Sequence, residues 1–240
     1  MYCDSATYDR GNNSFIAYSN IKILENDSMK LYGDSLHYFG NEEKAFLFGN
    51  VKLITNQILL NANSLIYDQN NNYAYYNDGG IIRHHGKNYT INSKVGRFNS
   101  INKVLFFKKN VRLEHIDYQI FSDTLVYHTE TEKTNIIGDT KIKSRNSTIS
   151  CSKGWFDNNN QTSSLKGNIV IDSKNYQFYA DSIFYQEQKG EAFAKGEVKI
   201  IDDSSQTVII GQFGYHNENK DSARIWEHAI MTQYLSLIHI

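Results

Sequence analysis

Residues 178–201 read FYADSIFYQEQKGEAFAKGEVKII, and this stretch contains the unit from which the chain is built. Apolar and polar residues alternate on both sides of a polar turn at Lys189-Gly190. Alternation with a period of two is typical of β-strands, because successive side chains leave opposite faces of the backbone. The stretch therefore predicts a strand, a turn and a second strand, with a glycine bend at Gly196 inside the second strand.

This unit recurs along the whole chain. The aromatic residue that closes its first strand returns every 29 to 31 residues, at Tyr8, Tyr38, Tyr67, Phe98, Tyr127, Phe156, Tyr185 and Tyr215. Second strands carry a glycine bend in the same register, as in Gly49-Asn50-Val51 and Gly79-Gly80-Ile81. Self-similarity at such a period is the signature of a repeat architecture. We expect about eight repeats over residues 1–231 and a tail, residues 232–240, outside the pattern.

Composition agrees with a thin, two-sheet β structure. The chain has 240 residues, of which 40% are hydrophobic, and it contains no proline, which would remove a donor from a continuous strand ladder. We therefore predict an all-β fold, a long open sandwich of stacked antiparallel strands. Because Met1 already occupies an apolar column of a repeat, the chain is expected to be a fragment that begins inside a repeat, with any export signal upstream.

The alternation also assigns the apolar face on which neighbouring repeats would pack. Successive repeats bury this face against each other, since a lone pair of strands cannot hide it. The inward side chains are predicted to be Leu36, Leu47, Val51, Leu53, Leu65, Leu105, Phe107, Val111, Leu113, Leu125, Ile183, Val198 and Ile200.

A basic column runs on the opposite, outward face. It comprises Lys22, Lys52, Arg112, Lys141 and Lys199, and Ile82 and Val170 interrupt it. Such a column is either solvated surface that guards against aggregation or a set of contacts for phosphate groups. Three acidic residues, Asp34, Asp123 and Asp181, form a comparable column, which we interpret as bulge residues that hydrogen-bond their own backbone.

No catalytic, metal or cofactor site is predicted from these residues. Acidic residues are scattered through the turns, whereas a glycosidase needs two carboxylates about 5–9.5 Å apart. Cys3 and Cys151 share a column five repeats apart, so strand spacing separates them too far for a disulfide. The formal net charge of −1 argues against a nucleic-acid surface, and no apolar run is long enough for a transmembrane helix.

The repeated columns resemble those of the OstA/LptA family of lipopolysaccharide-transport proteins. The pattern is clearest in residues 31–53, LYGDSLHYFGNEEKAFLFGNVKL, and again in residues 178–200. Some repeats depart from it, with Gly96 and Gly154 in place of an apolar residue and Lys109 in place of glycine.

This resemblance implies a periplasmic twisted β-jellyroll with an open, V-shaped trough. It implies further that the trough carries acyl chains of lipopolysaccharide or a related lipid, without catalysis. Open sheet edges would let the protein stack end to end with similar jellyrolls, or with copies of itself, by strand addition. Two alternatives remain open at this point: a purely structural β-solenoid such as an adhesin stalk, and a glycan-active β-helix.

Overall fold

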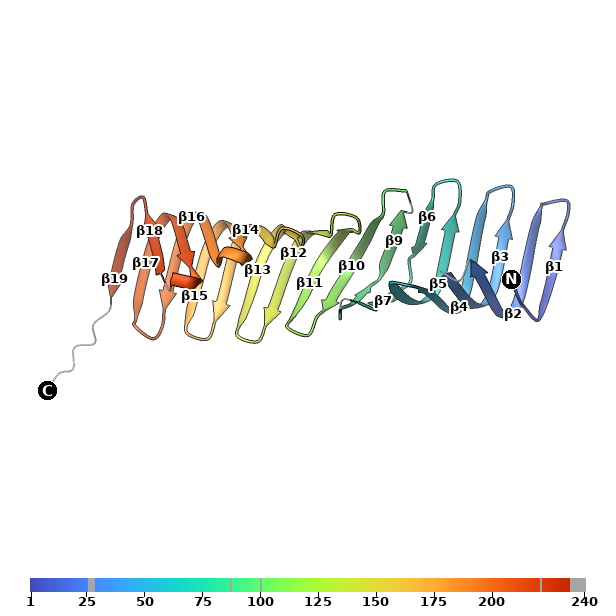
Figure 1. Cartoon of the computed structure of the whole chain (residues 1–240), viewed down its shortest axis with the longest axis horizontal. Coiled ribbons are helices and arrows are strands. Elements are labelled where there is room, and N and C mark those ends of the chain that lie inside the picture. The colour runs from blue at the N-terminus through green and yellow to red at the C-terminus, as the bar shows by residue number, and fades with distance from the viewer. Residues whose placement is uncertain (26–28, 87, 100, 221, 234–240) are drawn as a thin grey trace. The chain divides into compact units, whose positions relative to one another are not determined.

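A computed structural model describes residues 1–25, 29–86, 88–99, 101–220 and 222–233 (Figure 1). The chain divides into two compact units. We call residues 1–116 with 124–130 the N-terminal unit, and residues 117–123 with 131–240 the C-terminal unit. Strand β11 (Tyr118–His128) contributes residues to both units, so each unit is described separately below.

The N-terminal unit is a series of antiparallel hairpins in chain order (Figure 1). After β5 two successive strands of the repeat pattern are broken, so that β5 pairs with both β6 and β7, and β10 pairs with both β8 and β9. Its strands are β1 (Ser5–Asp9), β2 (Ser14–Glu25), β3 (Met29–Phe39), β4 (Lys44–Thr55), β5 (Ile58–Asp68), β6 (Tyr73–Tyr76), β7 (Gly80–His84), β8 (Thr90–Ser93), β9 (Val95–Asn99) and β10 (Val104–Glu114).

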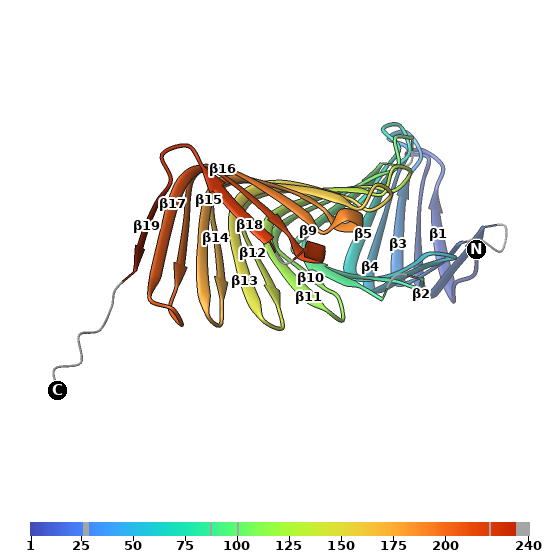
Figure 2. The same cartoon turned by 60° about the vertical axis from the view of Figure 1, so that its left-hand side comes forward.

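The C-terminal unit repeats the same antiparallel hairpin in strands that are mostly unbroken (Figure 2). At its end β17 pairs with both β18 and β19. Its elements are β12 (Lys133–Ser144), β13 (Ser147–Asp157), β14 (Thr162–Ser173), β15 (Tyr176–Gln186), the 3-10 helix η1 (Glu187–Lys189), β16 (Glu191–Asp202), β17 (Thr207–Asn217), the 3-10 helix η2 (Glu218–Lys220), β18 (Ser222–Trp226) and β19 (Ile230–Gln233). The prediction of an all-β fold of repeated antiparallel strands is confirmed.

In β4, β12, β14 and β16 the second strand of the repeat is bent at its glycine by a β-bulge. In β4 the pairing register shifts between Phe48 and Val51, and Gly49 and Asn50 both adopt positive φ angles, of 72° and 47°. A Cβ at Gly49 would also overlap the carboxylate of Asp34 on β3, so both backbone and space require glycine there. The bulge bends the strand. The segments before and after the bulge therefore line different parts of the interior.

Asp34 forms a different hydrogen bond at this bulge from the one predicted. Its carboxylate does not cap its own backbone but accepts a hydrogen bond of 2.8 Å from the side-chain amide of Asn50 on the next strand. Asp4 and Asn20 form the same pair one repeat earlier, also at 2.8 Å. In these two repeats the aspartate therefore fastens the bulge to the preceding strand.

The third repeat has a different register from the one predicted. Ala62 of β5 faces both Val51 and Gly80, so Gly80, not Ile81, occupies the position of Val51. Ile81 is accordingly 38% exposed on the outer face, whereas Ile82 is buried. The prediction that Ile82 interrupts the outward basic column was wrong, because Gly79-Gly80 imitates the Gly-Asn bend one residue out of register.

The last repeat shows a similar slip. Ala192 pairs with Tyr185 on one side and with His216 on the other, so His216 occupies the aromatic column and Tyr215 lies on the outer face. Strand β19 extends the pairing to Gln233, so residues 232 and 233 of the predicted tail belong to a strand, while residues 234–240 lie outside the described residues.

Asparagines link neighbouring turns along one edge of each unit. The side-chain amide of Asn70 donates to the carbonyl oxygen of Glu42 in the preceding turn, at 3.0 Å. In the C-terminal unit Asn159 bonds to Thr131 and Asn219 to Lys189 in the same way, at 3.1 and 2.8 Å. These asparagines thus join the turns of successive repeats.

Candidate functional site

The predicted inward side chains lie on one face of the bent strands in both units. In the N-terminal unit Leu36, Leu47 and Leu65 are opposite one another on β3, β4 and β5, and all three are buried. Phe107 and Val51 are 0% and 1% exposed. Of the other predicted residues, Leu105, Val111, Leu113, Leu125 and Val198 are buried, and Leu53, Ile183 and Ile200 are half-buried. Burial is deepest beside the bulge, where the two halves of each strand meet.

The C-terminal unit has a smaller buried cluster at the same place. Ala180, Ala194 and Val198 form it, and the half-buried side chains of Phe178, Ile183 and Ile225 pack against it. These three outer side chains do not close over the cluster but line a cavity of about 520 Å³. The cavity lies entirely within the C-terminal unit.

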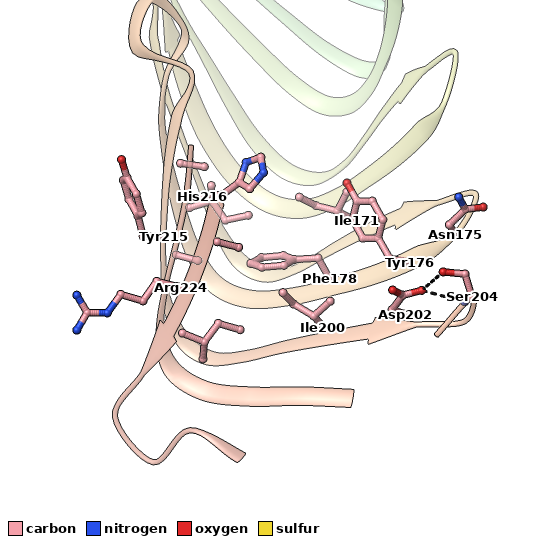
Figure 3. Close-up of a pocket in the computed structure, with 16 residues that line it drawn as sticks. Ile171, Asn175, Tyr176, Phe178, Ile200, Asp202, Ser204, Tyr215, His216 and Arg224 are labelled. Atoms are coloured by element: carbon pink, nitrogen blue, oxygen red, sulfur yellow. Dashed lines mark hydrogen bonds between the residues drawn. The ribbon is translucent and has the colours of Figure 1, made fainter. Parts of the chain in front are cut away.

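The wall of this cavity is apolar and its rim is polar (Figure 3). Ile171, Phe178 and Ile200 form one continuous row, because Ile171 pairs with Phe178 and Phe178 with Ile200. Toward the strand ends the lining changes to Asn175, Tyr176, Asp202 and Ser204. The site therefore has an apolar interior with hydrogen-bonding groups at one side.

Small side chains on β16 and β17 leave the space that forms the cavity. Ala194 on β16 occupies the position of Leu47 on β4, and its partner Gly214 on β17 occupies the position of Leu65 on β5. Two leucine side chains that fill the N-terminal interior are thus replaced by a methyl group and a hydrogen atom. The two small residues are visible in the sequence. That they face each other follows only from the pairing of the last repeat observed in the structure.

Residues of the last hairpin confirm which face is inward. Figure 3 shows His216 directed toward the side of Phe178 and Ile200, whereas Tyr215 and Arg224 project from the other side of their strands. Tyr215 packs against the ring of Phe193 on the outer face, with ring centroids 5.0 Å apart. The side chains of Tyr215 and His216 thus point to opposite sides of β17, although both residues border the cavity.

The rim carries one fixed negative charge. Hydrogen bonds from the Ser204 side chain and from the Ser205 and Ser204 backbone lower the pKa of Asp202 to about 2. Asp202 is therefore a carboxylate at any physiological pH, and its oxygen Oδ1 is already used to hold the turn that follows β16.

The predicted basic column lies on the outward side of its strands, and within the C-terminal unit Lys141 and Lys199 point away from the cavity side. Lys199 is next to Ile200 and points to the opposite side of β16, with its ammonium 5.8 Å from the centre of the Tyr179 ring. Arg112 forms an ion pair with Glu114. Lys22, Lys52 and Lys141 occupy equivalent outward positions. A phosphate role for this column stays a prediction. A lipid seated in the cavity would be separated by the sheet from Lys141 and Lys199, the two members of the column in the C-terminal unit.

Within the described part of the chain, no three His, Cys, Asp or Glu side chains are placed to hold a metal ion. No helix among those residues is long and apolar enough to cross a bilayer. Cys3 and Cys151 are both free thiols, and burial raises the pKa of the Cys151 thiol, which makes it a poor nucleophile.

Comparison with known proteins gives one family match. The model of the family described as OstA-like protein matches residues 1–123. The sequence matches none of the curated proteins with which it was compared. Among solved structures, LptH of Pseudomonas aeruginosa, described as the LptA homologous periplasmic component of the lipopolysaccharide transport device, is similar to 59% of this chain, with 83% of LptH covered. That similarity has a TM-score of 0.31 and 9% sequence identity.

Proposed function

The chain belongs to the family of OstA-like proteins, and from this premise we propose that it is a non-enzymatic lipid carrier in lipopolysaccharide transport to the outer membrane. In this proposal acyl chains of lipopolysaccharide or a related lipid enter the cavity of the C-terminal unit, and the protein works in the periplasm. The observation that carries it is the open apolar cavity bounded by Phe178, Ile183 and Ile200. Its polar rim suits a molecule with greasy chains and a hydrophilic head.

The energetics favour such a ligand. Each methylene that moves from water into an apolar site contributes about 0.8 kcal/mol. An acyl chain therefore gains several kilocalories per mole from the wall alone, without any specific polar contact. This is the behaviour expected of a carrier that accepts chains of varied length.

Partners would add at the sheet edges. Strand β1 pairs with β2 alone among the described strands, and all five of its residues are exposed. In the C-terminal unit β19 pairs with β17 alone among the described strands, and again every residue is exposed. Unpaired backbone groups on such strands accept a further strand, so we propose that similar jellyroll proteins, or copies of this chain, add there.

A test follows from the two residues that open the cavity. Ala194→Leu restores the leucine found at the equivalent position of the N-terminal unit and fills the space. We expect at least tenfold weaker binding of lipopolysaccharide, measured by equilibrium binding to purified protein. Ile200→Asp should act likewise by making the wall polar, and Lys199→Asp, one residue away on the outer face, is the matched control.

If Ala194→Leu and Ile200→Asp bound lipopolysaccharide as tightly as Lys199→Asp and the unchanged protein, the cavity would not be the lipid site. Circular dichroism and the Tm of each variant establish that it is folded.

A purely structural role is the second candidate. It is favoured by the N-terminal unit, where Leu47, Val51 and Phe107 are almost completely buried and pack like an ordinary core. On that account the cavity would bind no lipid, and all variants would behave alike in the binding experiment.

A further inference from the structure

Next to the cavity of the C-terminal unit lies a second, polar hollow of about 480 Å³. Two neighbouring turns form it: residues 144–148, between β12 and β13, and residues 172–174, at the end of β14. Every residue that lines it is polar or charged. The hollow and the cavity adjoin along the chain, because Lys174 lines the hollow and Asn175 lines the cavity.

The side chains change character in order along the sheet. The apolar row of the cavity continues from Ile171 to its partner Ile149. One step nearer the strand ends, on the same face, Ser147 pairs with Ser173. Beyond these two serines the turns carry Arg145 and Lys174. A molecule that extends out of the cavity here would meet apolar groups first, then hydroxyls, then two cations.

The hydroxyls and the turn backbone hold this arrangement in place. Ser144 Oγ lies 3.0 Å from Ser147 Oγ and accepts a hydrogen bond of 3.2 Å from the Ser147 backbone amide. Ser173 Oγ donates to the carbonyl oxygen of Asn146 across the two turns, at 3.3 Å. The turns that carry the two cations are thus tied to each other.

The two cations themselves are not neutralised. No described residue pairs with the side chain of Arg145 or of Lys174, and both are exposed. The hollow has one acidic residue, Asp172, which pairs with Thr148 next to the pair of serines. With two cations and one carboxylate among its lining residues, the hollow carries a net positive charge.

We infer that Arg145 and Lys174 form a subsite for the phosphate group of an amphiphilic ligand whose acyl chains occupy the adjacent cavity. A guanidinium and an ammonium together give a phosphate several charge-assisted hydrogen bonds, with serine hydroxyls as further donors. The carboxylate of Asp202 lies two strands away, roughly 10 Å, and favours orientation of the phosphate toward Arg145 and Lys174. This inference rests on the proposed function, and it assigns the headgroup contact to the rim instead of the outer basic column.

The test compares two lipids and two double variants. The lipids are phosphorylated lipid A and the same lipid A after removal of its phosphates. The first variant, Arg145→Gln with Lys174→Gln, removes the cations of the hollow. The second, Lys141→Gln with Lys199→Gln, removes the same charge from the outer face of the same unit. Affinity is measured for each lipid at low and at moderate salt.

We expect the first variant to bind phosphorylated lipid A roughly tenfold more weakly, a change of about 1.4 kcal/mol, and to bind the dephosphorylated lipid unchanged. Salt should weaken binding of the phosphorylated lipid to the unchanged protein more than to this variant, since salt screens exposed charges. The second variant should match the unchanged protein with both lipids.

Equal effects of the two variants, or equal losses for the two lipids, would overturn the phosphate subsite. If the unchanged protein bound both lipids with the same affinity, the subsite would also be excluded while the carrier function stood. Binding of neither lipid would contradict the carrier function itself and the subsite with it.

Discussion

The hydroxyl of Tyr76 lies 2.7 Å from Oγ of Ser93 in the interior of the N-terminal unit, and Ser93 in turn donates to the carbonyl oxygen of Val95 at 3.0 Å. Tyr76 occupies the position that Leu47 has one repeat earlier, and its ring fills space left by Gly80 and Gly96. Burial raises the pKa of the phenol, so Tyr76 stays neutral as a donor or acceptor there. Tyr76 and the two glycines thus stand at positions that hold three aliphatic residues in the preceding repeat.

Gly96→Ala should destabilise the N-terminal unit by about 1–3 kcal/mol, because the added Cβ overlaps the Tyr76 ring and the core there is already packed. The φ angle of Gly96 is not positive, so the substitution tests packing without backbone strain. Urea unfolding measures the change.

Gly33→Ala is the control, since a Cβ there meets its nearest atom, Leu47 Cδ2, at an ordinary 3.5 Å. The double variant Tyr76→Leu with Gly80→Val rebuilds the pair formed by Leu47 and Val51 in the preceding repeat. Its loss of unfolding free energy should be smaller than the sum of the losses in the two single variants, by about 1 kcal/mol or more. Additive effects in that cycle would mean that Tyr76 and Gly80 do not share the same space.

Lys109→Gly should stabilise the N-terminal unit by about 1 kcal/mol. Lys109 stands where other repeats have glycine in the bulge, and its φ of 65° is unfavourable for a residue with a Cβ. The reciprocal change Gly138→Lys, at φ 87°, should destabilise the C-terminal unit. Thermal unfolding of both variants checks the pair, and a lower Tm for Lys109→Gly would show that the lysine side chain contributes more than its backbone strain costs.

Acid should weaken the turn after β13. Hydrogen bonds from Asn160 and Lys133, the latter 3.0 Å away, lower the pKa of Asp157 to about 2 from 3.8. A lowered folded-state pKa contributes stability above pH 3.8, and this contribution disappears as the pH falls toward 2. Asp157→Asn should therefore be less stable than the unchanged protein at pH 6, and the difference in urea midpoint should shrink between pH 4 and pH 2. A difference that is the same at pH 6 and pH 2 would contradict this role for the charge.

Repeat number, strand alternation and the inward face could be read from the sequence because each depends on local patterning. Leu36, Leu47 and Leu65 were placed correctly, since a one-residue error would move each to the opposite face. The predicted register was wrong at Gly79-Gly80, where either glycine could form the bend, and in the last repeat, where His216 takes the place expected for Tyr215. As a result, Ile82 and Tyr215 were assigned to the wrong face of the sheet, although both have the spacing of the repeat.

The cavity could not be predicted in the same way. Its volume depends on Ala194 facing Gly214 across two strands, a pairing that spans the slipped register. Of the thirteen inward residues predicted, Ile183 and Ile200 line the cavity. The polar hollow was missed for another reason: Arg145 and Lys174 lie in turns, where charged residues are common, and only the fold brings them beside Ile171.

Photo-crosslinking along β16 tests the central claim most directly, because neighbouring residues of that strand face opposite sides. A photoreactive amino acid at Ile200 faces the cavity, and the same group at Lys199 faces the exterior. With lipopolysaccharide present, the account predicts strong labelling of the lipid from positions 200 and 183 and little from position 199. Equal labelling from all three positions, or labelling from 199 alone, would contradict the proposal that acyl chains lie in this cavity.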